Sequence, residues 1–108
     1  MLDFSLSPEQ IDLQKKAREF ALKEILPVAW YYDEIDETPM PVLKKAYDEG
    51  MINGDIPEEY GGKGYGLVES FVITEEFAAA CPGLATSIFD NSLGMEPLLL
   101  SKNESLRK

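Results

Sequence analysis

The chain has 108 residues, of which 44% are hydrophobic, and carries a formal net charge of −10 from 20 acidic against 10 basic residues. This length accommodates one domain with one modest core. Because a strongly acidic protein repels polyanions, the charge argues against nucleic acid and anionic membrane surfaces as partners. The sequence contains no run of about 18 apolar residues that would predict a membrane span.

The sequence has a single cysteine, Cys81, and no histidine. An internal disulfide, a Ser-His or Cys-His nucleophile pair and an ordinary structural zinc site therefore cannot be built, and we expect no metal site. Cys81 precedes Pro82 in an alanine-rich surround, which is typical of an inert thiol. The chain opens with an acidic residue, Asp3, and no basic n-region, so we expect a cytoplasmic location.

The first predicted helix begins after Ser7. Ser7 is a good N-cap, Pro8 suits the first helical position, and Gln10 stands where it closes a capping box. Apolar residues then recur at helical intervals. We expect this helix to reach about Leu26, where Pro27 ends or kinks it.

The next segment is predicted as a short apolar stretch, residues 28–32, followed by an acidic loop over residues 33–38. A second helix starts at Pro41 and stops at Gly50, which suits the left-handed position after a helix end. Its expected buried residues are Leu43, Ala46 and Tyr47.

Residues 56–66 form a glycine-rich loop whose glycines are Gly61, Gly62, Gly64 and Gly66. Four glycines in six residues permit positive φ angles and close approach of neighbouring segments, at an entropic cost that a slack linker has no reason to carry. The phosphate-loop template fails because Gly64 follows Lys63 in place of a hydroxyl residue, and the dinucleotide fingerprint fails on its last interval. The loop is therefore predicted to have a defined conformation and not to bind a nucleotide.

Three more helices are predicted after the glycine-rich loop. The first ends at Cys81 and carries an apolar stripe of Leu67, Val68, Phe71, Thr74, Phe77 and Ala78. Residues 84–93 form a helix of apolar and small residues, which we expect in the middle of the bundle. Asn103 caps a last helix, about one turn of which precedes Lys108. The predicted fold class is all-α, an up-down helical bundle truncated at its last helix.

Two pairs of adjacent glutamates invite a catalytic interpretation, Glu58 with Glu59 and Glu75 with Glu76. Neighbours on a helix diverge by about 100°, and the first pair lies at a polar loop entrance, so neither pair aims two carboxylates at one point. We expect both pairs to be solvated surface and identify no catalytic residue.

Taken together, these segments resemble the amino-terminal helical domain of the acyl-CoA dehydrogenases, in particular the short- and medium-chain branch. Each motif alone is weak, but six in register across nearly the whole chain are specific. The segments that carry the resemblance are residues 4–10, 17–21 with 25–29, 50–52, 56–62, 75–78, and 91–94 before Pro97.

The resemblance implies an FAD-dependent oxidoreductase that converts acyl-CoA to trans-2-enoyl-CoA, forms a homotetramer when complete and passes electrons to an electron-transferring flavoprotein. In that family a β-rich middle domain holds much of the flavin, and a carboxy-terminal helical domain supplies the catalytic glutamate. Residues 1–108 correspond to the amino-terminal domain alone. We therefore expect this chain by itself to be inactive and not to retain FAD.

The resemblance also implies that the helix after Cys81 forms part of the wall of the acyl pocket. Ala85, Phe89 and Leu93 are spaced i, i+4, i+8 on one stripe, with Thr86 beside them, and these four are the predicted substrate-binding residues. The alternative is that the stripe is simply bundle core. Phe89 is bulkier than the residues of medium-chain relatives at this position, which indicates a shallow pocket.

A surface for the flavoprotein partner is also implied by the resemblance. Leu13, Met51, Tyr65 and Ile73 are the candidates for an apolar groove, with Lys63 at its rim. The alternative function is a helical interaction module without catalysis. Charge and periodicity do not separate the two, because the same helices serve both.

Overall fold

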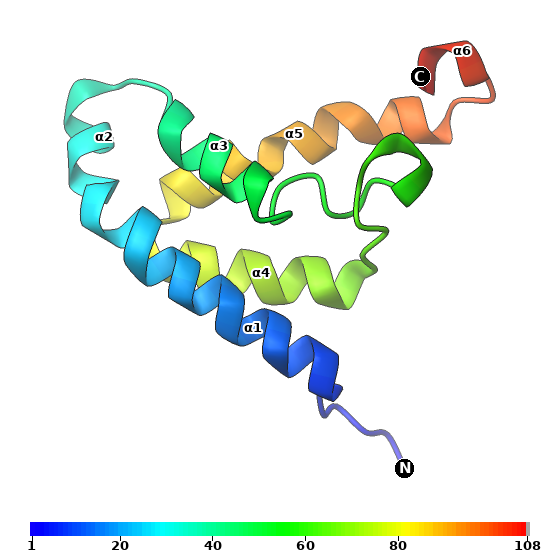
Figure 1. The fold of residues 1–108 in the computed structure, drawn as a ribbon, viewed down its shortest axis with the longest axis horizontal. Helices are drawn as coiled ribbons and strands as arrows, with labels where there is room; N and C mark the ends of the chain where they lie inside the picture. The colour runs from blue at the N-terminus through cyan, green and yellow to red at the C-terminus, as the bar shows by residue number, and fades with distance from the viewer. Residues whose placement is uncertain (108) are drawn as a thin grey trace.

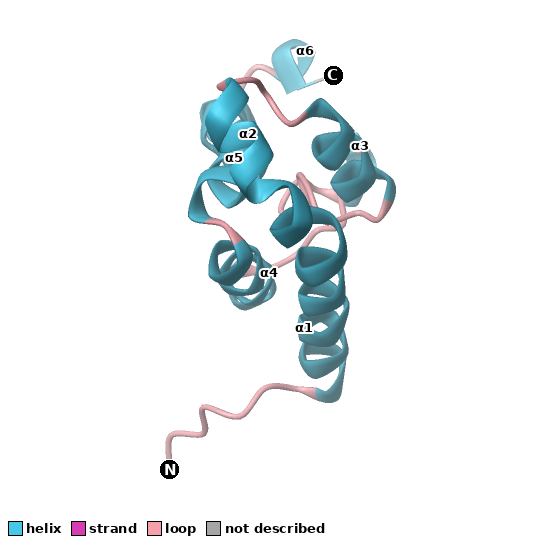
Figure 2. Cartoon of the chain, turned by 90° about the vertical axis from the view of Figure 1, so that its left-hand side faces the viewer, coloured by secondary structure: helices cyan, strands magenta, loops and turns pink. Residues whose placement is uncertain are grey.

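The computed structural model describes residues 1–107, and all regular elements in this part of the chain are helical (Figures 1 and 2). Helices α1 and α2 lead to the upper left of Figure 1, α3 returns to the right, α4 runs left again and α5 runs right. This alternation confirms the predicted all-α up-down bundle. The helices are α1 (Pro8–Phe20), α2 (Ala29–Ile35), α3 (Met40–Asp48), α4 (Leu67–Ala80), α5 (Pro82–Leu100) and α6 (Glu104–Arg107).

The start of α1 is the capping box that the sequence predicts. The backbone N–H of Gln10 donates to Ser7 Oγ at 3.2 Å, and the backbone N–H of Ser7 donates to Gln10 Oε1 at 2.9 Å. At the other end of the chain Asn103 caps α6, because its Oδ1 accepts from the backbone N–H of Ser105 at 3.1 Å. The predicted end of this helix at Lys108 lies outside the described residues.

Regular α-helix ends at Phe20, earlier than the predicted Leu26, but the chain stays helical. A π-helical turn follows, in which the Leu26 N–H donates to the carbonyl of Ala21, five residues back. Pro27 lacks an N–H, and its ring crowds the carbonyl four residues earlier, so a widened turn before it relieves the clash. A 3₁₀ turn, Leu26–Val28, then leads into α2.

The acidic loop is shorter than predicted, because residues 33–35 belong to the last turn of α2. Asp36 ends this helix in the left-handed region, with φ +52, and its N–H donates to the carbonyl of Tyr32 at 3.2 Å. Aspartate tolerates this conformation better than most residues. The loop therefore begins at Asp36.

Helix α3 ends at Asp48, and Gly50 takes the predicted left-handed position just after it. Gly50 has φ +70, its N–H donates to the Tyr47 carbonyl at 2.9 Å, and the N–H of Met51 donates to the Ala46 carbonyl at 2.8 Å. These two bonds form a Schellman motif, which satisfies carbonyls at the helix end.

The buried face of α3 differs from the prediction. Val42 and Ala46 are buried, whereas Leu43 is half-buried and Tyr47 is 64% exposed. The face directed at the core is thus rotated by one residue from the predicted one. Val42 and Ala46 are four apart, which places them on one stripe.

The predicted apolar stripe of α4 is also wrong at its start. Leu67 and Phe71 are 74% and 66% exposed, and only Phe77 of the predicted set is fully buried. The residues that face the core are Val72, Ile73, Glu76 and Phe77. Helix α4 packs between α1 and α5, so its buried face is the one that meets both neighbours.

Glu76 corrects the expectation that both residues of its pair are solvated. It is only 7% exposed and lies at core spacing on α4. Arg18 on α1 donates to both of its carboxylate oxygens, with Nε–Oε2 at 2.8 Å and Nη2–Oε1 at 2.7 Å. A bidentate guanidinium makes this burial tolerable. The sequence contains a signal for this ion pair, namely a charged residue at a core-facing position of the helix.

The hydrophobic core lies where α1 and the π-helical turn meet α3, α4 and α5. Its buried members are Ala17, Phe20, Ala21, Ile25, Val42, Ala46, Met51, Ile73, Phe77, Leu84, Ala85 and Ile88.

Candidate functional site

Helix α5 spans Pro82–Leu100, which is longer than the predicted residues 84–93. It is not in the middle of the bundle. Only its first half is buried, through Leu84, Ala85 and Ile88, and its second half runs out beyond α4 in Figure 1. A helix with small and apolar residues all round is expected to be covered on all sides. Within residues 1–107, α5 is covered on one face.

Two of the four predicted substrate-binding residues pack against the core, and the other two are exposed. Ala85 is 3% exposed, and the half-buried Phe89 packs against the core. Leu93 is 68% exposed although it continues the same stripe, because the packed part of α5 ends before it. Thr86 is exposed, and its hydroxyl donates to the Pro82 carbonyl at 2.9 Å. Their contact with a substrate stays a prediction.

The ring of Phe89 rests on another ring. Its centroid lies 5.7 Å from that of Phe77 with an interplanar angle of 40°, and Phe77 in turn lies 5.1 Å from Phe20. These rings come from α5, α4 and α1 respectively. The side chain at the centre of the predicted stripe is thus anchored on one side by the core.

The glycine-rich loop is compact, as the sequence predicts. A Cβ on Gly62 would lie 1.8 Å from the carbonyl oxygen of Ile56, so only glycine fits there. The same carbonyl accepts the N–H of Gly64 at 3.0 Å.

The residues just before this loop tie it to α5. Asn91 Nδ2 donates to Asn53 Oδ1 at 2.6 Å, and Ser92 Oγ donates to Asp55 Oδ1 at 3.1 Å. These contacts hold α5 at the point where it leaves the core. The segment before the glycine-rich loop therefore contacts the middle of α5.

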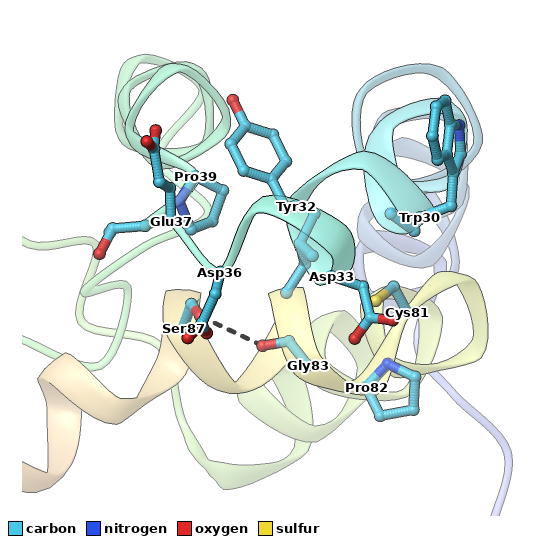
Figure 3. Close-up of a pocket in the computed structure, with 13 residues that line it drawn as sticks. Trp30, Tyr32, Asp33, Asp36, Glu37, Pro39, Cys81, Pro82, Gly83 and Ser87 are labelled. Carbon is cyan, nitrogen blue, oxygen red and sulfur yellow. Dashed lines mark hydrogen bonds between the residues drawn. The ribbon is translucent and has the colours of Figure 1, made fainter.

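A cavity of about 680 Å³ lies beside the first half of α5, against α2 and the loop after it (Figure 3). The carboxylates of Asp33 and Asp36 point toward α5, where Ser87 Oγ donates to the Gly83 carbonyl at 3.2 Å. The lining contains three carboxylates and no lysine or arginine, so phosphate groups of coenzyme A or FAD are repelled here. The lining residues are Ala29, Trp30, Tyr32, Asp33, Asp36, Glu37, Thr38, Pro39, Cys81, Pro82, Gly83, Leu84 and Ser87.

This cavity does not fit the diphosphate of FAD, and the described residues offer no other cradle with the sequence pattern of a dinucleotide site. Within residues 1–107, no group of three or more His, Cys, Asp or Glu side chains gathers where it would hold a metal ion. None of the helices in this part of the chain is both long and apolar enough to cross a bilayer.

A smaller hollow of about 340 Å³ lies between α1, α4 and the glycine-rich loop. Leu13, Met51 and Tyr65 line it together, as predicted for the groove. Ile73 does not line it, because this side chain is 2% exposed and belongs to the core. The charged residues around the hollow are Glu9, Asp12, Lys16, Glu49, Lys63 and Glu69.

The rim of this hollow contains ordered polar contacts. Lys16 Nζ lies 2.9 Å from Asp12 Oδ2, and the hydrogen bond between them lowers the pKa of Asp12 and raises that of Lys16. Gln10 Nε2 donates to Glu69 Oε1 at 2.8 Å, which lowers the pKa of Glu69. The hollow is therefore apolar at its floor and charged at its edge.

The fold matches part of a solved enzyme structure. A crystal structure of an active-site mutant of nitroalkane oxidase, crystallized with 1-nitrohexane, is similar with a TM-score of 0.84 and 28% sequence identity, covering 98% of this chain and 26% of that one. Residues 7–108 match the family model of the acyl-CoA dehydrogenase N-terminal domain, and the chain belongs to this family. The resemblance inferred from the motifs is confirmed.

Individual relatives agree with this assignment. The chain is 34% identical over 107 residues to the probable medium-chain specific acyl-CoA dehydrogenase 2, mitochondrial, of Caenorhabditis briggsae, covering 99% of this chain and 26% of that protein. It is 34% identical over 101 residues to an acyl-CoA dehydrogenase of Bacillus subtilis (strain 168), covering 92% and 26%. It is 39% identical over 85 residues to the acryloyl-CoA reductase (NADH) of Anaerotignum propionicum, covering 79% and 22%. The chain spans about a quarter of the length of these relatives.

Proposed function

We propose that residues 1–108 are the amino-terminal helical domain of an FAD-dependent acyl-CoA dehydrogenase, which oxidises acyl-CoA to trans-2-enoyl-CoA. The observation that carries the proposal is α5 in a chain of this family, a helix whose first half packs on the core through Leu84, Ala85 and Ile88 while Leu93 and Leu100 further along it are exposed. The exposed part of α5 is the wall that this domain contributes to the acyl pocket. The middle and carboxy-terminal domains belong to the complete enzyme.

The residues of α5 have separate roles in this proposal. Leu93 and the exposed part of Phe89 contact the acyl chain and exclude water from it, while Ala85 keeps α5 close to the core. Thr86 presents an exposed hydroxyl near the start of the helix. In the complete enzyme FAD would supply the redox chemistry, and no residue of this chain is proposed to hold it. No residue of this chain is proposed as the catalytic base.

The hollow lined by Leu13, Met51 and Tyr65 is the proposed contact for the electron-transferring flavoprotein. An apolar floor inside a charged rim is the usual anatomy of a protein interface. The homotetramer of the complete enzyme is part of the same proposal, and a cytoplasmic location stays a prediction.

A fusion enzyme tests the proposed function. This chain replaces the matching amino-terminal part of the Bacillus subtilis acyl-CoA dehydrogenase, to which it is 34% identical. We expect the purified fusion enzyme to bind flavin and to reduce an electron-accepting dye when given a saturated acyl-CoA. The chain alone is expected to do neither.

The same experiment separates the two function classes. A fusion enzyme that is folded and loaded with flavin, yet inactive from butyryl-CoA to palmitoyl-CoA, contradicts the enzyme proposal and favours the interaction module. If the 108-residue chain alone is flavin-coloured or reduces the dye, the proposal that flavin binding and catalysis require the other domains is contradicted.

A further inference from the structure

Three phenylalanine rings connect the proposed acyl pocket to the far side of the core. Phe89 on α5 is half-buried, whereas Phe77 on α4 and Phe20 on α1 are 0% and 3% exposed. The ring centroids are 5.7 Å apart from Phe89 to Phe77 and 5.1 Å apart from Phe77 to Phe20. Phe89 is therefore the outer end of a row whose inner members are fixed by the core.

The contact with Phe77 restricts where the Phe89 ring can go. Protein interiors are close-packed, and Phe77 is fully buried with its ring against that of Phe89. The Phe89 ring therefore cannot tilt inward toward α4. It stays half-buried at the edge of the core, with its exposed part directed to where the proposed function places the acyl chain.

We propose that Phe77 is a positioning residue for acyl-chain length, which acts by holding the Phe89 ring in the pocket through direct ring contact. This inference rests on the proposed function. Phe77 itself is fully buried and does not contact substrate. Removing part of its ring opens space into which Phe89 tilts, and the pocket deepens although Phe89 is still present.

The fusion enzyme provides the activity test. The measured quantity is the ratio of kcat/KM for octanoyl-CoA to kcat/KM for butyryl-CoA. Phe77→Leu is expected to raise this ratio roughly four- to fifteenfold, because one or two more methylenes of the substrate become buried. The gain should come mainly from a lower KM for octanoyl-CoA, with kcat for butyryl-CoA nearly unchanged. If the leucine variant does not fold, Phe77→Met replaces it, and the same increase in the ratio is expected.

Phe20→Leu is the matched control. It changes the same residue type at similar burial and contacts Phe77, but it lies one ring further from Phe89. We expect it to leave the ratio within about twofold of the parent. An equal shift in both variants means general loosening of the core and overturns the inference.

A second readout does not depend on activity. Fluorinated phenylalanine at position 89 of the 108-residue chain reports the ring environment by ¹⁹F NMR. We expect one resonance in the parent and in Phe20→Leu, and a shifted or second resonance in Phe77→Leu. An unchanged resonance in Phe77→Leu overturns the inference.

The two proposals fail in different ways. If Phe89→Ala raises the ratio and neither Phe77 variant does, the pocket assignment stands and the positioning role is wrong. If Phe89→Ala leaves the ratio unchanged, Phe89 does not face the acyl chain and the positioning role of Phe77 is wrong, whereas flavin binding and dehydrogenase activity of the fusion enzyme still decide the proposed function.

Discussion

Gly62 is the residue on which the shape of the glycine-rich loop depends most directly. The nearest atom to an added Cβ is a backbone carbonyl oxygen, that of Ile56, at 1.8 Å. A backbone atom cannot rotate away as a side chain does. Gly94, in contrast, lies inside α5 with nothing within 4 Å of an added Cβ.

These two glycines give opposite predictions for the same substitution. Gly62→Ala should lower the free energy of unfolding by about 1–3 kcal/mol, because the loop must shift to relieve the overlap. Gly94→Ala should raise it by about 0.5–1 kcal/mol, since alanine loses less conformational entropy in a helix. Urea denaturation followed by circular dichroism measures both. Equal stability of the two variants contradicts the loop geometry.

Phe89 carries the prediction on chain length. An enclosed phenylalanine side chain buries on the order of 150–250 Å² and so occupies the volume of several substrate methylenes. Each methylene that cannot be buried forfeits about 0.8 kcal/mol, so three or four amount to roughly a hundredfold. In the fusion enzyme, Phe89→Ala should therefore increase kcat/KM for octanoyl-CoA relative to butyryl-CoA. A ratio within about twofold of the parent means that Phe89 is bundle core only.

At the scale of the elements, the ion pair of Arg18 and Glu76 joins α1 to α4. The Arg18 side chain is 61% exposed, but that of Glu76 is only 8% exposed. Arg18→Ala leaves a nearly buried carboxylate without its partner, which is costly. We expect a fall in melting temperature of a few degrees, larger than that of Lys16→Ala.

Lys16→Ala is the control because it removes one half of a pair in which both side chains are 63% exposed. Such surface pairs contribute little. Differential scanning calorimetry measures the two variants. If both variants show the same fall in melting temperature, the Arg18–Glu76 pair contributes no more to stability than a surface pair.

Two further contacts between elements make stability depend on pH. A hydrogen bond from Lys45 on α3 lowers the pKa of Glu24, in the π-helical turn, below its ordinary value of 4.5. A hydrogen bond from Gln10 on α1 does the same for Glu69 on α4. A depressed folded-state pKa stabilises the protein above the unfolded value and stops doing so as pH falls through the folded value.

The melting temperature is therefore expected to decline as pH is lowered from 4.5. Glu24→Gln with Glu69→Gln should flatten this decline and reduce stability above that pH. Thermal unfolding at a series of pH values from about 7 to about 3 provides the measurement. An unchanged slope in the double variant shows that other carboxyl groups cause the acid dependence.

At the scale of the whole molecule, the second half of α5 exposes apolar side chains. Leu93 and Leu100 are 68% and 77% exposed, and Phe89 with residues 98–99 is half-buried beside them. Contiguous apolar surface of this kind favours association. The net charge of −10 opposes it, and salt screens that charge.

We therefore expect the 108-residue chain to self-associate, and more strongly at high salt. Sedimentation velocity over a range of concentrations measures this. Leu93→Ser with Leu100→Ser should reduce the association, whereas Leu2→Ser, in the extended amino-terminal segment, should not. A single monomer species at high concentration and high salt contradicts the prediction.

The sequence by itself determined the local features and the family. The capping box at Ser7 and the helix end at Gly50 were predictable because each depends on hydrogen bonds between residues no more than five apart. The all-α class follows from periodicity, and the family from motifs in order. For the site, the spacing predicted that Ala85 and Phe89 share one face of a helix, and in the structure both contact the core.

Only the tertiary structure decided which faces of the helices are covered. The buried sides of α3 and α4 depend on the helices beside them, and the burial of Glu76 depends on an arginine 58 residues away. The exposure of Leu93 was not predictable from the spacing either, since Leu93 continues the stripe of Phe89 but lies beyond the packed part of α5. Helical periodicity describes an isolated element, whereas burial is a property of the neighbours that the folded chain brings against it.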